Sequence, residues 1–120
     1  MKYLCLVYSD EQLLHSLPDS PEDAECLAYA ESVQGSGRML AAEALQSVHT
    51  ATTVRMRGGK LSITDGPFAE TKEQLAGFYL IQAKDLNEAI QVAGQIPAAR
   101  VGSVEAVSYT HLRAHETGRN

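Results

Sequence analysis

A polar loop at residues 64–74 carries the residue types best suited to chemistry. Asp65 and Glu70 lie on either side of a predicted turn, which can bring two carboxylates to one cleft. Repulsion between paired carboxylates keeps one of them protonated near neutral pH, as a general acid or base requires. The alternative for Asp65 is structural, because turn chemistry alone selects an Asp before Gly-Pro. We expect it to accept a hydrogen bond from the Phe68 N–H, and both roles are compatible.

Two further residues could take part in proton transfer. Glu43 lies in a strand-like run, where an inward-facing carboxylate would lose water and gain proton affinity. An outward-facing Glu43 would be an ordinary surface group, and the pattern favours neither orientation. His49 follows in a loop and could act as a base, although a lone histidine usually has no catalytic role. The candidate catalytic set is therefore Asp65, Glu43, Glu70 and His49.

Three residues are candidates for substrate binding: Phe68, Lys72 and Tyr79. Lys72, together with Glu73, could hold a carboxylate or a phosphate-like group, but charged surface turns more often stay solvated. Tyr79 follows Phe78 in a predicted strand, so the two side chains should point to opposite faces of the sheet. One of them would then face a helix layer, and both could simply be packing residues.

The sequence argues against metals, cofactors and nucleic acid. His111 and His115 have the spacing of a helical metal pair, but no third ligand accompanies them. No glycine-rich nucleotide loop is present, so we predict no cofactor. A net charge of -5 offers no attraction to phosphate backbones. Cys5 and Cys26 lie in apolar runs typical of reduced thiols, and no signal peptide or membrane span is evident, which favours the cytoplasm.

The chain alternates between strand and helix patterns. Ser20, Pro21 and the acids that follow predict a helix start, with the helix running to about Gln34. Asp85 opens a second helix that Pro97 ends. We predict strands at residues 2–8, 38–45, 52–57, 60–64, 77–83 and 102–107. The predicted inward-facing helix residues are Ala24, Leu27, Ala28, Ala30 and Val33 in the first helix, and Leu86, Ala89, Ile90 and Ala93 in the second.

One turn is defined more sharply than the others. Gly58 and Gly59 separate the strands at 52–57 and 60–64, and both glycines can adopt the positive φ that a primed hairpin turn needs.

These elements predict one α+β domain over residues 1–107, with an antiparallel sheet beneath two helices. The other face of the sheet would stay apolar and need cover, which a homodimer stacking sheet on sheet would supply. Residues 108–120 are polar and unpatterned, and we interpret them as a disordered tail or a non-native extension.

The loop sequence DGPFAETKE at residues 65–73 resembles the signature of DGPF-motif proteins in the YCII-related family. The resemblance extends over roughly nine-tenths of the chain, through residues 1–3, 37–38, 43–45, 50–55, 77–81, 96–100 and 102–105. It implies a ferredoxin-like subunit that forms a dimeric α+β barrel with an enzyme-like cleft. YCII relatives carry a histidine in the first helix that is thought to work with an Asp, but the stretch around Cys26 has none.

Two functional hypotheses follow. The first is a cofactor-independent, enzyme-like homodimer that binds a small organic molecule in a cleft near the DGPF loop. The second is a non-catalytic dimeric binding or regulatory module, since no nucleophile–base pair is assured. The resemblance links that module to a sigma-factor-like regulator.

Overall fold

A computed structural model of the chain describes residues 1–13 and 23–109. The predicted helix cap Ser20 and the histidines at 15, 111 and 115 lie outside these residues. The regular elements are β1 (Lys2–Ser9), α1 (Asp23–Gly35), β2 (Met39–Ala44), η1 (Val48–Thr50), β3 (Thr52–Arg57), β4 (Lys60–Asp65), β5 (Gln74–Gln82), α2 (Leu86–Gln95), η2 (Pro97–Arg100) and β6 (Ser103–Tyr109).

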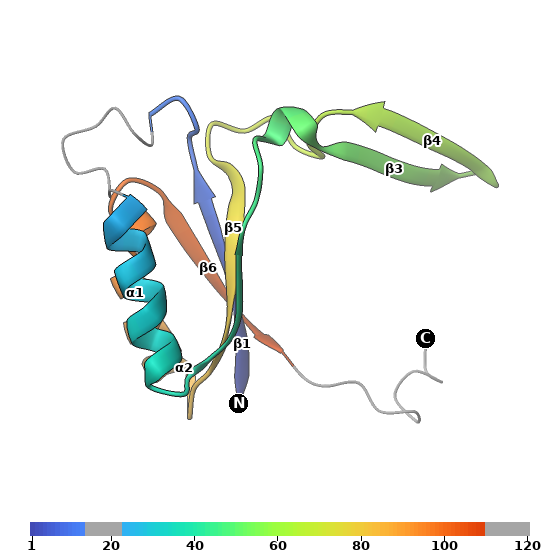
Figure 1. The fold of residues 1–120 in the computed structure, drawn as a ribbon. Coiled ribbons are helices and arrows are strands. Elements are labelled where there is room, and N and C mark those ends of the chain that lie inside the picture. The colour runs from blue at the N-terminus through green and yellow to red at the C-terminus, as the bar shows by residue number, and fades with distance from the viewer. Residues whose placement is uncertain (14–22, 110–120) are drawn as a thin grey trace, which may run out of the picture.

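Strands β2, β5, β1 and β6 form one antiparallel sheet in that order. Both helices cover the same face of this sheet (Figure 1). The helices connect strands into a βαββαβ arrangement in which β5 and β1 are central, which is the arrangement of a ferredoxin-like fold. The predicted α+β class is therefore confirmed.

The core lies between this sheet and the helices. Alternate residues of β1 point into it, which leaves Tyr3, Cys5, Val7 and Ser9 buried. Burial raises the pKa of the Cys5 thiol, so the thiol stays protonated and packs as a small apolar group. Ile81 of β5 and Ile96 after α2 are the largest apolar residues of this layer that are fully enclosed.

Helix α2 begins as predicted, with the Asp85 side chain accepting a hydrogen bond from the Glu88 N–H at 2.9 Å. Its buried residues are Ala89, Val92 and Ala93. The expectation that Leu86 and Ile90 face inward was wrong, because both are about half exposed. The helix is rotated so that Ala89, Val92 and Ala93, rather than Leu86 and Ile90, face the core.

Helix α1 shows a similar rotation. Leu27 and the alanines at 24 and 28 are exposed, contrary to the predicted stripe. The sheet-facing side instead carries the partly buried Cys26, Tyr29 and Ala30 and the buried Val33. These residues follow the i, i+3, i+4, i+7 spacing of one helix face. Tyr29 and Cys26 were overlooked because the sequence reasoning gave weight to small aliphatic residues.

Tyr29 connects the two helical segments. Its hydroxyl donates a hydrogen bond to the Val92 carbonyl oxygen at 2.7 Å, and its ring lies edge-on to Tyr79 with centroids 6.0 Å apart. Burial, followed by the neighbouring Tyr79, raises the pKa of Tyr29 to about 12. The neutral phenol is therefore the form that this packing stabilises.

We predict that stability falls as pH rises from about 10, the pKa of an unfolded tyrosine, to about 12. The folded protein holds the proton more tightly than the unfolded chain, so Tyr29 contributes most below pH 10. Tyr29→Phe should be less stable at neutral pH by about 0.5–1.5 kcal/mol, the value of one hydrogen bond. It should also lose less stability above pH 10. Urea unfolding across this range checks the slope, and identical slopes for both proteins would contradict the assignment.

The β3–β4 hairpin leaves the main sheet and projects as an arm (Figure 1). Its turn is the one predicted, since Gly58 and Gly59 have φ of +56° and +77°. The prediction of two strands was correct, but sequence alone did not show that they form a separate sheet. The radius of gyration is 16.5 Å, against roughly 13–14 Å for a compact domain of this size, as expected of a chain with such an arm.

The open face of the main sheet lies on the side away from the helices. The strand register puts Leu4, Leu6, Phe78 and Leu80 on this face. Glu43, Glu105 and Val107 share it through the pairings of β2 and β6.

In the part of the chain described here, no helix is long and apolar enough to cross a membrane.

Candidate functional site

A cavity of about 540 Å³ lies at the elbow where the arm leaves the sheet. We call it the elbow cavity. One wall comes from Tyr8 and Leu75 of the sheet, and the opposite wall from Pro67, Phe68 and Ala69 of the DGPF loop, residues 65–73. The connection between β2 and β3 contributes Leu45, Gln46, Ser47, Val48, Thr50 and Ala51, and the end of the loop with the start of β5 contributes Thr71, Glu73 and Gln74.

The β2–β3 connection is held in place by Glu11. Its carboxylate accepts hydrogen bonds from the Val48 N–H at 2.7 Å and from the Ser47 hydroxyl at 2.9 Å. The backbone bond from Val48, followed by the Ser47 bond, lowers the pKa of Glu11. Glu11 therefore stays ionised at neutral pH and keeps this wall of the elbow cavity fixed against the end of β1.

The DGPF loop is fixed by bonds that differ from the expected ones. The Gly66 N–H donates to the Ala51 carbonyl at 2.8 Å, and the Thr53 hydroxyl donates to the Gly66 carbonyl at 3.0 Å. Among the described residues, no hydrogen bond joins Asp65 to the Phe68 N–H, so that expectation was wrong. Gly66 has φ of +107°, a conformation that favours glycine, and the chain turns at this residue without the expected Asp65 hydrogen bond.

The end of the loop is irregular rather than helical, with bends at Lys72 and Glu73. The Thr71 hydroxyl donates to the Glu73 carbonyl at 2.6 Å, and the Gln74 side chain donates to the Ala69 carbonyl at 3.1 Å. The expected helical turn capped by Thr71 is therefore absent, and β5 begins at Gln74. These bonds keep Ala69 and Thr71 in the cavity wall.

Phe68 is the most exposed large hydrophobic residue among those described, at 77%. The Arg55 guanidinium lies over its ring, 5.4 Å from the centroid. Such a cation–π contact orients an aromatic ring with little burial. Phe68 thus presents one side of an ordered ring to the elbow cavity.

Two polar networks border the cavity. The Ser103 hydroxyl donates to the Glu73 carboxylate at 2.6 Å, which ties the DGPF loop to the start of β6. The Tyr8 hydroxyl donates to the Glu105 carboxylate at 3.0 Å. This hydrogen bond is the main reason that the pKa of Tyr8 is raised, and it keeps the phenol neutral.

The predicted site residues are divided among different places. Phe68 lines the elbow cavity, whereas Tyr79 and Glu43 border a second cavity between α1 and the sheet. Asp65, Glu70, Lys72 and His49 are exposed and line neither of these two cavities.

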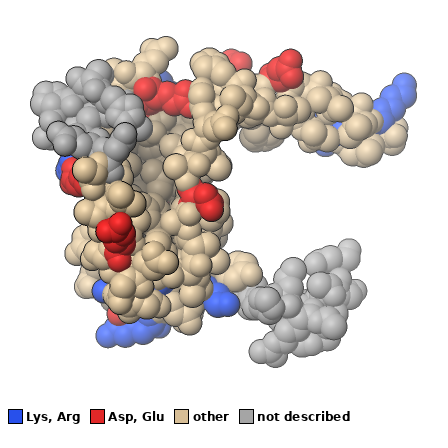
Figure 2. Space-filling view, in the orientation of Figure 1, with Lys and Arg blue, Asp and Glu red and all other residues tan. Residues whose placement is uncertain are grey.

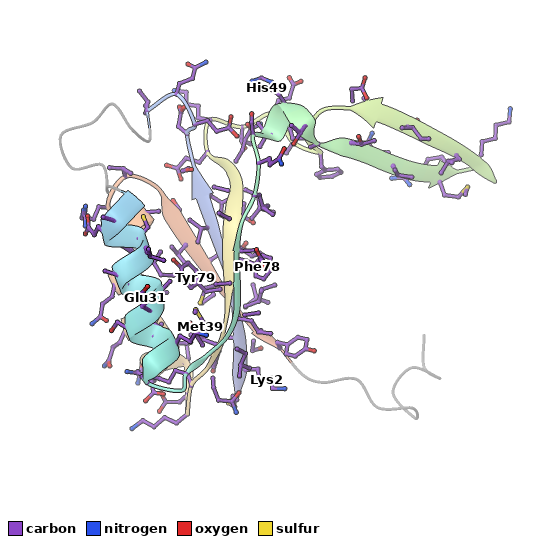
Figure 3. The ribbon with its side chains drawn as sticks, in the orientation of Figure 1. Lys2, Glu31, Met39, His49, Phe78 and Tyr79 are labelled. Carbon is purple, nitrogen blue, oxygen red and sulfur yellow. The ribbon has the colours of Figure 1, made fainter. Side chains whose placement is uncertain are left out.

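His49 lies in η1, where its proximity contributes to the lowered pKa of Glu11 after the bonds from Val48 and Ser47. Figure 3 shows His49 at the elbow and Phe78 and Tyr79 on opposite faces of β5, which confirms their predicted alternation. The catalytic and substrate-binding roles predicted for the site residues from sequence stay predictions.

Two polar residues of the elbow cavity, Tyr8 and Ser47, were not predicted from sequence, and Glu73 was predicted only as the companion of Lys72 in holding an anion. Tyr8 ends an apolar strand, and its pattern resembles that of a packing residue. Ser47 precedes a 3-10 turn that has no strong sequence signature. Glu73 lies next to Lys72, where a charged pair is usually read as a solvated surface. Only Glu73 lies inside the motif that drew attention to the loop.

Among the described residues, no group of three or more His, Cys, Asp or Glu side chains is placed to hold a metal ion. The elbow cavity is therefore built from apolar and uncharged polar groups around one carboxylate.

The chain belongs to the YCII-related family, because the family model described as YCII-related domain matches residues 1–113. It is also similar to an uncharacterised protein of Rhizobium meliloti (strain 1021). The two sequences are 37% identical over 111 residues, which cover 88% of this chain and 89% of the other protein. The family of the chain is thereby established, and the elbow cavity is the structural feature that bears on its function.

Proposed function

We propose that this protein is a homodimer that binds a small organic molecule in the elbow cavity beside the DGPF loop. The observation that carries the proposal is the cavity itself, because its volume of about 540 Å³ falls within the usual range for ligand sites. Its walls are mainly apolar, and a few fixed polar groups converge on it. This combination is typical of sites that orient a small ligand.

The lining indicates which ligands fit. Among the described residues that line the cavity, Glu73 is the one acidic side chain, and none is a lysine or an arginine. The Tyr8 phenol is neutral. A neutral or cationic molecule with an apolar body would therefore be favoured, since an anion would meet a carboxylate without a compensating cation. Phe68 offers an aromatic face to the apolar body.

Binding is better supported than catalysis. The acids predicted to work together, Asp65 and Glu70, do not line the cavity. Glu73 is engaged by Ser103 and acts as a hydrogen-bond acceptor. The enzyme-like alternative would need Glu73 or Tyr8 to exchange a proton with the ligand, and a pH-dependent turnover of a bound compound would support it.

The homodimer is supported by two apolar faces that one chain holds apart. The arm exposes Val54, Met56, Leu61 and Ile63, and the register pairs them on one face. A lone two-stranded hairpin is marginally stable in water, so this face needs cover. The open face of the main sheet is apolar as well, and the arm projects beyond it rather than folding onto it (Figure 1).

A second copy of the chain offers both surfaces for this cover. The arm carries Arg55, Arg57 and Lys60 on the face opposite to its apolar one, while the open sheet face carries Glu43 and Glu105 on its two edge strands. Figure 2 shows basic side chains at the arm tip and acidic ones on the sheet side of the concave surface. In a two-fold dimer, each arm would lay its apolar face on the central strands of the partner's sheet and leave its cations in solvent.

The ligand proposal is tested by a thermal-shift screen of small metabolites, followed by binding measurements on variants. Phe68→Ala should weaken binding of any hit at least about tenfold, since it removes an aromatic wall. Leu86→Ala is the control, because Leu86 is another exposed apolar residue, on α2 and outside the elbow cavity. Hits that respond equally to both substitutions, or to neither, would contradict the proposed site.

A further inference from the structure

A second cavity of about 340 Å³ lies between helix α1 and the sheet. We call it the interlayer cavity. It shares no lining residue with the elbow cavity. Its walls are mostly small and apolar, with Val7, Ala30, Ala42, Ala44, Ala76, Ile96, Pro97 and Ala98 among them.

Ser9 is a buried polar residue in the mostly apolar lining of this cavity. It occupies the last position of β1 on the face where Tyr3, Cys5 and Val7 form the core. Only 1% of its surface is exposed, and its Oγ has no hydrogen-bond partner among the described residues. An unsatisfied buried hydroxyl is unfavourable, so native proteins nearly always supply a partner from protein, water or ligand.

The volume and the lining of the interlayer cavity favour an occupant larger than a water molecule. One water needs roughly 30 Å³ and two or more polar partners. The interlayer cavity exceeds that volume about tenfold and is lined mainly by carbon. A small apolar body would fill the walls, and one polar group on it would satisfy Ser9.

The other residues with polar side chains in the described lining are Cys26, Glu43 and Tyr79. Tyr79 lies on the helix side of the sheet, and burial, followed by the proximity of Cys26, raises its pKa. Glu43 borders the cavity, but the register pairs it with Phe78 on the open face, so it contributes main chain here. In the described part of the chain, no lysine, arginine or histidine lines the cavity. A charged ligand would therefore find no counter-ion.

We propose that the interlayer cavity is a second binding site, which takes a small, neutral, largely apolar molecule with one hydrogen-bonding group directed at Ser9 Oγ. The ligand class is that of simple alcohols, ketones or amides on a hydrocarbon body. This site does not depend on the elbow cavity, because the two cavities have no lining residue in common.

The test uses benzyl alcohol and toluene as a matched pair of probes, which differ by the polar group. Amide chemical shifts of the full-length protein are followed by heteronuclear NMR during titration. Benzyl alcohol should shift the amides of Ser9, Ala30 and Ala76, and should bind more tightly than toluene. Equal affinity for the two probes, or no binding at millimolar concentration, would overturn the proposal.

Two substitutions distinguish probe binding in the interlayer cavity from probe binding in the elbow cavity. Ser9→Ala should weaken benzyl alcohol about five- to tenfold, the loss expected for one hydrogen bond, and leave toluene unchanged. Ala30→Leu should fill the cavity and abolish binding of both probes, with the NMR spectrum reporting that it is folded. Ser62→Ala on the arm is the control and should change nothing. Probe shifts confined to residues 45–51 and 67–69 would place binding in the elbow cavity and overturn the interlayer site.

Discussion

Ile63→Asp is expected to convert the homodimer into monomers. Ile63 is 63% exposed in the single chain and lies on the apolar face of the arm, which the proposed dimer buries. A carboxylate buried there without a partner would cost about 3–5 kcal/mol, which raises the dissociation constant by at least about a hundredfold. Sedimentation velocity at micromolar concentration would show a shift from dimer to monomer.

Ser62→Asp is the matched control for this change. It introduces the same charge one residue away, on the opposite face of β4, beside its cross-strand partner Arg55. It should remain dimeric, and circular dichroism should show both variants folded. A wild-type protein that is monomeric at micromolar concentration would refute the homodimer, and equal dissociation of both variants would refute the assigned face.

Gly102→Ala is expected to destabilise the protein by about 1–3 kcal/mol, the usual penalty for overpacking. A Cβ at this position would collide with the Tyr8 carbonyl oxygen and lie 3.3 Å from both Ser9 Cα and the Ala98 carbonyl oxygen. These groups are backbone and cannot rotate away. The substitution would separate the start of β6 from the end of β1. Urea unfolding at fixed protein concentration measures the loss.

The same methyl group should have the opposite effect at Gly94. This residue lies within α2, and nothing is within 4 Å of a Cβ built there. Gly94→Ala should therefore raise stability by about 0.5–1 kcal/mol, the propensity difference in a helix. If both substitutions changed stability by the same sign and size, the close approach at Gly102 would not be a real constraint.

Local chemistry accounts for the parts of the fold that sequence predicted well. The paired glycines 58 and 59 allow a primed turn whatever surrounds them, and Asp85 caps α2 with atoms only three residues away. The β1 pattern is continuous because the strand lies in the centre of the sheet. Each of these features depends on neighbours in the chain, so periodicity and turn chemistry are sufficient.

Sequence was less informative where a contact spans the fold. The orientation of α1 depends on Tyr29 reaching Val92, which lies 63 residues away. Glu11 holds Val48, and Ser103 holds Glu73, through contacts that no local motif encodes. The motif at residues 65–73 located one wall of the elbow cavity. Its catalytic candidates were chosen because they are acids, since the sequence does not show which side chains point into the cavity. The cavity faces Phe68 and Glu73 instead of Asp65 and Glu70.

The central claim is that the elbow cavity holds a small organic molecule, and a crystal structure with the best hit from the metabolite screen tests it most directly. We predict ligand density between Phe68 and Tyr8, with a polar group of the ligand within hydrogen-bonding distance of Glu73. Density for the ligand elsewhere on the protein, with only water in the elbow cavity, would contradict the claim.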